Sequence, residues 1–174
     1  MNSIKEVIMG DDVVTIDDNA FSKCTGITSI KIGNGVEKLG ANAFNGCSNL
    51  TRCDIGPKVN SIGKEAYAGC TAITRLICRA ATPPACGTWA LQDIDKWNCT
   101  LSVPEGSITA YQQADQWKDF FFMDNDMTKI SSFANESVKP THIYDLNGLK
   151  TENSKRGMNI IKMNDGSVRK IIAK

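Results

Sequence analysis

Apolar residues recur every 23 positions along the first half of this chain. Phe21, Phe44 and Tyr67 keep this spacing. Six further columns follow the same period: Cys24, Cys47 and Cys70; Ile27, Leu50 and Ile73; Ile30, Cys53 and Leu76; Ile32, Ile55 and Cys78; Val13, Val36 and Val59; Ile16, Leu39 and Ile62. Counting back 23 positions from Ile27, Ile30 and Ile32 gives three further apolar residues: Ile4, Val7 and Met9. A fixed period of roughly 20–50 residues is typical of solenoids, so the pattern predicts a repeat array over residues 1–79.

Each unit divides into three pieces. In "ITSIKIGNGV" (27–36), the alternation around Ile30 and Ile32 predicts a short strand with both side chains directed inward. A second extended segment, "VEKLG", follows and ends on Gly40. Then "ANAFNGC" brings Phe44 and Cys47 to one face of a short helical turn. We expect short parallel strands that stack one unit on the next.

A single unit of this kind cannot bury its own apolar face, whereas neighbouring units can cover one another. Burial of a branched aliphatic or aromatic side chain stabilises by about 1.5–3 kcal/mol. Six or seven such side chains in each unit offset the entropy of ordering it only when a neighbour is present. The array therefore needs a cap at its end.

The strand segment resembles the leucine-rich repeat pattern L-x-x-L-x-L-x-x-N-x-L, with Asn34 one residue before the polar position. The longer stretch "VEKLGANAFNGCSNLTRCDIGPKVNSIGKEAYAGCTAITRL" resembles the BspA-like, or Treponema-type, leucine-rich repeat family over residues 4–79. The resemblance implies a leucine-rich-repeat solenoid. It also implies a surface-exposed or secreted bacterial protein that binds other proteins or host components without catalysis.

The pattern changes over residues 80–123, where we expect a C-terminal capping repeat. Pro83 and Pro84 cannot donate to a strand ladder, but the segment 89–91 still echoes the Asn-Ala-Phe step. Leu101 and Val103 echo the strand, 25 residues after their counterparts. Ser107 is a suitable N-cap for a helix that would carry large side chains over the last unit. Those side chains are Ile108, Tyr111 and Trp117.

Residues 124–139 are polar and precede Pro140, which indicates a linker. Residues 140–174 predict a small β segment with strands at 142–146, 158–163 and 167–172. Asn147–Gly148 and Asp165–Gly166 are typical of hairpin turns. This tail resembles short C-terminal segments of surface proteins from Bacteroidetes, some of which are sorting signals. Two interpretations remain: an export segment, or a small meander that packs on the cap.

The seven cysteines divide into two groups. Cys24, Cys47 and Cys70 should form one column with about 5 Å between units, so we interpret them as buried core residues. A straight column neither pairs uniquely nor converges on a metal ion. Cys86 and Cys99 lie in the cap outside the repeat and are the candidates for a disulfide.

The outward residues of the strands define the candidate binding face. They form three columns: Glu6, Ser29, Arg52 and Arg75; Ile8, Lys31, Asp54 and Ile77; Gly10, Gly33, Gly56 and Arg79. One interpretation is a solvated sheet face that its charges keep from aggregating. The other is a protein-binding strip, and the arginines near the cap could also take an anionic glycan.

Composition disfavours several function classes. The 20 basic and 19 acidic residues leave a net charge of +1, so there is no electrostatic footprint for nucleic acid. No apolar run reaches the roughly 20 residues of a membrane span. The first ten residues lack the basic start and apolar core of a signal peptide. His142 is the single histidine, and no acid pair converges with it, so we expect no catalytic residues, metal or cofactor.

These observations predict non-catalytic recognition at a bacterial surface or in the secreted state. The expected partner is a protein, including a host extracellular protein, or a glycan. The alternative is a structural stalk or terminus of a longer repeat array, with an export or anchoring segment at its C-terminal end.

Overall fold

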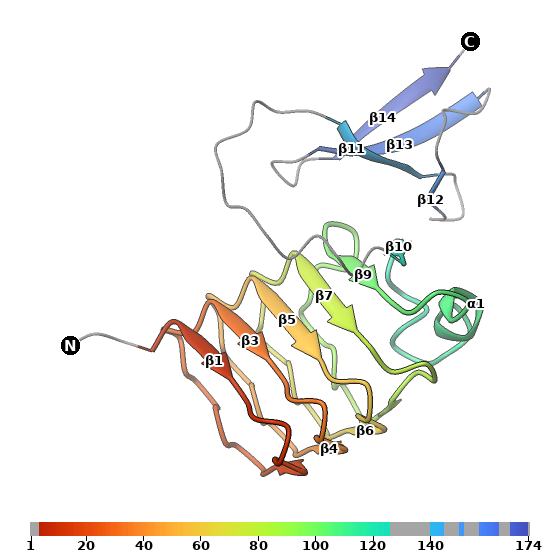
Figure 1. Ribbon diagram of the computed structural model, residues 1–174. Helices are drawn as coiled ribbons and strands as arrows, with labels where there is room; N and C mark the ends of the chain where they lie inside the picture. The colour runs from red at the N-terminus through yellow and green to blue at the C-terminus, as the bar shows by residue number, and fades with distance from the viewer. Residues whose placement is uncertain (1–3, 126–139, 145–149, 152–156, 164–167, 174) are drawn as a thin grey trace.

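The computed structural model describes residues 4–125, 140–144, 150–151, 157–163 and 168–173. Successive coils of the chain stack into a solenoid, and one strand of each coil joins a parallel sheet along one side (Figure 1). That sheet has the order β1-β3-β5-β7-β9-β10. Its strands are β1 (Glu6–Ile8), β3 (Ser29–Lys31), β5 (Arg52–Ile55), β7 (Arg75–Cys78), β9 (Thr100–Ser102) and β10 (Phe122–Asp124).

The second extended segment of each coil forms a smaller parallel sheet. Its four strands are β2 (Thr15–Ile16), β4 (Lys38–Leu39), β6 (Ser61–Ile62) and β8 (Ala85–Cys86). Cys86 is the register partner of Ile62, so it continues the Ile16 and Leu39 column one residue later than the period requires. The interpretation of Cys86 as lying outside the repeat was therefore wrong.

Register in the larger sheet follows the 23-residue spacing. Ile30 pairs with Cys53, and Cys53 pairs with Leu76. Leu76 then pairs with Leu101, which confirms the expected 25-residue step into the cap. The sixth strand, β10, was not expected. Asp124, which we expected to begin the linker, ends this strand and is buried.

The core runs along the solenoid axis as columns of like side chains. Phe21 stacks on Phe44 at 5.5 Å between ring centroids, and Phe44 stacks on Tyr67 at 5.1 Å. The thiols of Cys47 and Cys70 are buried and do more than fill space. Each donates to the carbonyl oxygen of the phenylalanine one coil earlier, at 3.2 Å for Cys47 and 3.1 Å for Cys70. The interpretation as buried core residues holds for Cys47 and Cys70, whereas Cys24 at the open end of the column is partly exposed.

The segment after each short strand is a series of turns and not a helix. Its second turn residue adopts a left-handed conformation at Asn19, Asn42, Glu65 and Trp89, with φ between 52° and 59°. Further along, Gly46 and Gly69 repeat a second positive φ of 74°. The expected helical turn was therefore wrong in type, since two left-handed residues interrupt any helical run. Phe44 and Cys47 nevertheless both face the core.

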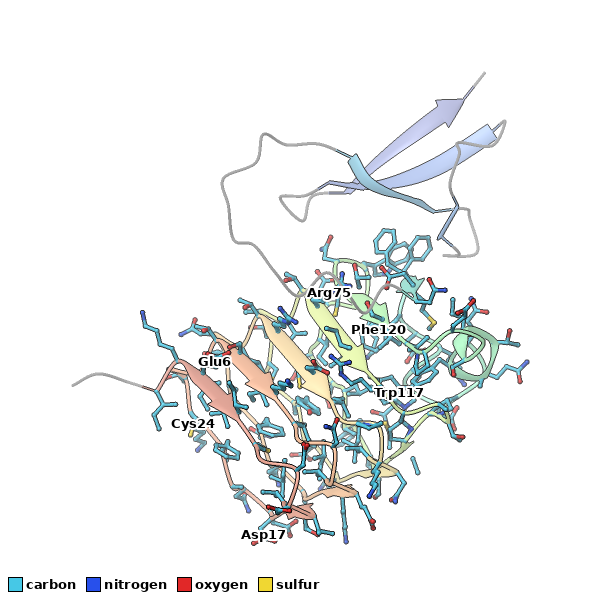
Figure 2. The ribbon with its side chains drawn as sticks, in the orientation of Figure 1. Glu6, Asp17, Cys24, Arg75, Trp117 and Phe120 are labelled. Atoms are coloured by element: carbon cyan, nitrogen blue, oxygen red, sulfur yellow. The ribbon has the colours of Figure 1, made fainter. Side chains whose placement is uncertain are left out.

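The cap contains one turn of helix, α1 (Ile108–Tyr111). Ser107 does not cap it, because its hydroxyl donates to the carbonyl oxygen of Ala81 at 2.9 Å. The expectation of a longer helix reaching Trp117 was wrong, yet the covering role of that residue is confirmed. Trp117 is fully buried, donates to Pro84 O at 2.9 Å and meets Tyr111 edge to face. Figure 2 shows Trp117 and Phe120 towards one end of the solenoid and Cys24 towards the other.

The tail forms an antiparallel sheet of order β12-β11-β13-β14. Its strands are β11 (Pro140–Tyr144), β12 (Lys150–Thr151), β13 (Gly157–Met163) and β14 (Val168–Ala173). The three expected strands are present at nearly the expected places, and β12 is an addition. The predicted turns at Asn147–Gly148 and Asp165–Gly166, and the linker after Asn125, lie outside the described residues.

Candidate binding face

Two rows of side chains run across the outer face of the larger sheet. Strand register aligns the first row as Glu6, Ser29, Arg52, Arg75, Thr100 and Phe122. It aligns the second as Ile8, Lys31, Asp54, Ile77, Ser102 and Asp124. The predicted rows are thus neighbours on one face, and each gains two residues from β9 and β10.

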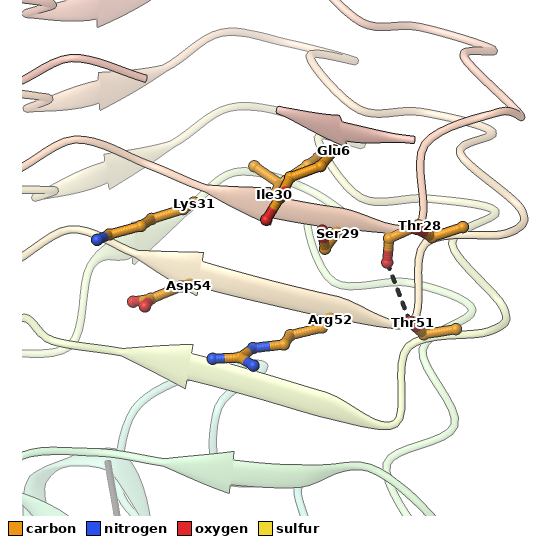
Figure 3. Close-up of a pocket in the computed structure, with 8 residues that line it drawn as sticks. All are labelled: Glu6, Thr28, Ser29, Ile30, Lys31, Thr51, Arg52 and Asp54. Atoms are coloured by element: carbon orange, nitrogen blue, oxygen red, sulfur yellow. Dashed lines mark hydrogen bonds between the residues drawn. The ribbon is translucent and has the colours of Figure 1, made fainter. Parts of the chain in front are cut away.

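The half of this face formed by β1, β3 and β5 is open. A shallow hollow of about 500 Å³ lies on it, between rows of threonines and charged residues (Figure 3). Glu6 and Lys31 are exposed, Ser29 and Arg52 are half-buried, and Ile8 retains 66% of its accessible surface. Along one margin Thr51 Oγ1 donates to Thr28 O at 3.0 Å, and Thr28 Oγ1 donates to Lys5 O at the same distance. These side-chain bonds join successive coils and keep the margin in place.

The half formed by β7, β9 and β10 is closed, and the closure begins at Asp54 of β5, which also lines the hollow. Asp54 is 4% exposed and Ile77 is completely buried, so the expectation that both face solvent was wrong. The guanidinium of Arg79 donates to both carboxylate oxygens of Asp54, from Nε and one Nη, at 2.7 Å each. Hydrogen bonding to Asp54 raises the pKa of Arg79. A planar fork of this kind is the geometry that guanidinium and carboxylate groups favour.

A second series of side-chain hydrogen bonds continues this closed surface. Arg75 Nη2 donates to Ser102 Oγ at 2.9 Å, and Ser102 Oγ donates to Asp124 Oδ1 at 2.6 Å. Ser102 and Asp124 are both fully buried. The sequence analysis missed these two residues because they come from the segment after the regular repeat. The one available signal was "FMD" (122–124), an apolar pair followed by a carboxylate directly before the polar stretch.

The three arginines expected to gather near the cap do not act as one cluster. Arg79 binds Asp54, Arg75 binds Ser102, and Arg52 is the register partner of Arg75. At least two of the three guanidiniums are therefore committed to partners within the chain. This arrangement weakens the expectation of an anionic glycan at that end.

The glycine column does not provide an open surface either. A Cβ at Gly56 would lie 2.4 Å from the carbonyl oxygen of Gly33, and one at Gly33 would lie 2.2 Å from that of Gly10. Successive coils approach too closely here for any side chain. Gly33 and Gly56 are therefore required for stacking.

The thiols form no reactive site among the described residues. All seven cysteines are free, so the structure does not pair Cys86 with Cys99. Burial raises the pKa of Cys53 to about 12 and that of Cys78 to about 11. Because the thiolate is the nucleophilic form, these residues are unreactive at neutral pH. No group of three or more metal-ligating side chains converges within the part of the chain described here.

Comparison with known proteins agrees with this geometry. The chain matches the family described as BspA type leucine rich repeat region (6 copies) over residues 1–83. A crystal structure of a leucine-rich repeat protein from Bacteroides ovatus is similar, with 28% sequence identity and a TM-score of 0.50. The match covers 58% of this chain and 30% of that one, so this chain corresponds to less than a third of its relative. No curated protein matches the chain.

None of the helices in the described part of the chain is long and apolar enough to cross a membrane. Leucine-rich repeat regions serve in general as protein-interaction or structural modules, and proteins of this class are generally non-catalytic. Residues 1–83, just under half of the chain, match the BspA-type leucine-rich repeat family, and the parallel-strand solenoid is the fold expected of a leucine-rich repeat protein.

Proposed function

We propose that this chain is a recognition module that binds a protein partner through the open half of its strand face. The module would act at a bacterial cell surface or in the secreted state, where proteins with this type of repeat are commonly found. Binding needs no catalysis. It requires only a rigid surface whose shape and charge match those of the partner.

The observation that carries this proposal is the contrast between the two halves of the face. Around the hollow, Glu6 and Lys31 present both signs of charge beside the exposed side chain of Ile8. At the border with the closed half, Asp54, which also lines the hollow, is bound by Arg79. Exposed charge next to an exposed aliphatic is the composition of a small interface, with an apolar centre and a polar rim.

Charge reversal tests the proposal. We would immobilise the whole chain as wild type and as the double variant Lys31→Glu/Arg52→Glu, and probe both with an array of purified extracellular proteins. The matched control is Lys58→Glu, an exposed lysine on the turn between β5 and β6. We expect at least one protein whose binding the double variant weakens about tenfold or more and the control leaves unchanged. Binding that the double variant retains in full would remove this face from consideration.

A structural role is the second candidate. The closed half of the face favours it, because a surface built for binding would not be expected to commit Arg75 and Arg79 to internal partners. In this role the array is a stalk, and residues 140–174 act as an export or anchoring segment. Deleting 140–174 from the full-length gene product and fractionating the cells tests that part. Unchanged delivery to the surface would leave the tail without an export role.

A further inference from the structure

Trp89 is unlike its counterparts in the other coils. It occupies the left-handed turn position that Asn19, Asn42 and Glu65 occupy, with φ of 58°. Asparagine tolerates this conformation well, whereas a bulky aromatic residue rarely adopts it. The side chain is nevertheless 57% exposed, so burial of the ring does not explain the choice of tryptophan. An aromatic residue in an unfavourable backbone conformation with an exposed ring indicates selection for contact with something outside the chain.

Gln116 holds the backbone of the turn both before and after Trp89. The side-chain amide of Gln116 donates from Nε2 to Gly87 O at 2.7 Å and accepts from Leu91 N at 3.0 Å. Glu65 N also donates to Thr88 O at 3.0 Å from the preceding coil. These bonds hold the backbone on either side of Trp89 in the chain. The ring is therefore presented from a rigid base, which lowers the entropy lost when a ligand binds.

A shallow hollow of about 380 Å³ lies beside the ring. Its other lining residues are all polar: Thr88, Gln92, Lys96, Gln116 and Asp119. Lys96 and Asp119 carry opposite formal charges, so the lining has no net charge. The Lys96 ammonium lies 5.9 Å from the centroid of the Phe120 ring, which limits the directions it can take. Volumes of this order match small-ligand sites.

We propose that this hollow is a carbohydrate subsite that takes one unit of a neutral oligosaccharide. A pyranose ring has an apolar face of C–H groups, which packs on an exposed aromatic ring, and a rim of hydroxyls. Amide, hydroxyl and carboxylate side chains beside the tryptophan supply the donors and acceptors for that rim. Trp89 provides the stacking surface, and Gln92, Thr88 and Asp119 provide hydrogen-bonding groups.

The lining favours a neutral sugar over the other ligands that bind exposed tryptophans. Lys96 and Asp119 cancel in formal charge, so the lining offers no net attraction to an acidic sugar or to a cationic ligand. An apolar peptide anchor needs an apolar pocket, whereas five of the six lining residues here are polar. The subsite is lined by the turns that follow β8 and by Gln116 and Asp119 after α1, and none of its lining residues belongs to the hollow on the strand face. The proposal is therefore independent of the one made for protein binding.

Native affinity electrophoresis of the whole chain tests the proposed carbohydrate subsite. The gels would contain one of four soluble neutral polysaccharides: mixed-linkage β-glucan, xyloglucan, galactomannan or starch. A fifth gel with polygalacturonate serves as the acidic comparison. We expect at least one neutral polysaccharide to retard the wild type. Titration calorimetry with an oligosaccharide cut from that polymer should then show affinity at least about tenfold weaker for Trp89→Asn.

Trp89→Asn is a suitable variant because asparagine is the natural residue at this turn in two other coils, so folding is preserved. Trp97→Ala is the matched control. Trp97 is 63% exposed, stacks on Phe121 at 4.5 Å and does not line this hollow, so its removal should leave retardation unchanged. Equal melting temperatures would show that the variants are folded. No retardation of the wild type by any neutral polymer, retardation by polygalacturonate alone, or an undiminished effect in Trp89→Asn would each overturn the proposal.

Discussion

Arg79 binds both carboxylate oxygens of Asp54 at 2.7 Å, although 25 residues separate the two along the chain. Asp54 lies in the middle of β5, and Arg79 directly follows β7, so the pair ties two neighbouring coils across the outer face of the sheet. The Asp54 side chain is 5% exposed and that of Arg79 is 29% exposed. This partial burial protects the pair from screening by salt.

The first prediction concerns this pair. Asp54→Asn should lower the free energy of unfolding by about 2 kcal/mol, because it removes a charge-assisted bidentate contact and leaves the guanidinium without its anion. Urea denaturation followed by circular dichroism measures the change. Asp12→Asn, on an exposed turn, serves as the control and should have little effect. A double variant, Asp54→Leu/Arg79→Leu, should lose less than the sum of its single variants, whereas strict additivity would show that the two residues are not coupled.

The second prediction concerns the aromatic column. Phe44 is completely buried between Phe21 and Tyr67, so Phe44→Ala should cost about 3–5 kcal/mol through lost transfer energy and an unfilled cavity. Phe21 is only partly buried at the open end of the column, and Phe21→Ala should cost clearly less. Thermal and urea denaturation of both variants gives the comparison. Equal losses would contradict a column whose end is exposed.

The third prediction concerns thiol reactivity. Native protein treated with iodoacetamide at pH 8 should be alkylated first at Cys24, which is partly exposed at the open end of the cysteine column. Cys86 is also partly exposed, but burial raises its pKa to about 12 and should slow its reaction. Peptide mass spectrometry locates the modified residues. All seven cysteines should react in guanidinium chloride without reductant, whereas a Cys86–Cys99 peptide pair would show that a disulfide does form.

The fourth prediction concerns stability at alkaline pH. Burial raises the pKa of Cys53 to about 12 and of Cys78 to about 11, from an ordinary value of 9.0, and it raises the pKa of Tyr67 well above 10.0. The unfolded chain therefore releases these protons at lower pH than the folded chain. Their contribution to stability is complete below pH 9 and decreases as pH rises towards 11–12.

Urea denaturation at a series of pH values measures this decrease in the free energy of unfolding. Cys53→Val is the control, because apolar Ile30 and Leu76 fill the same column in neighbouring coils. The variant should show a smaller loss of stability between pH 9 and 11 than the wild type. An identical pH dependence in both proteins would mean that Cys53 does not contribute to the loss of stability at alkaline pH.

Most of the fold follows from the sequence because stacking repeats one interaction. The spacing of Phe21, Phe44 and Tyr67 determines which side chains meet, and each contact in the core copies the contact one coil earlier. Strand positions and register could be predicted for the same reason. The turn conformation could not be read from apolar spacing, because Phe44 and Cys47 face inward from a left-handed turn as well as from a helix.

The periodic pattern by itself determined the solenoid, its core columns and the row that each outward residue occupies. Only the tertiary structure decided which outward residues meet solvent. Ile77 and Asp54 occupy outward positions equivalent to that of Lys31, yet both are buried, whereas Lys31 is exposed. Arg79 stands where the earlier coils have glycine and binds Asp54. Arg75 is bound by Ser102, which with Asp124 comes from beyond the regular repeat. A period specifies contacts between copies, and contacts with unrepeated segments depend on loop lengths and side chains that the period does not contain.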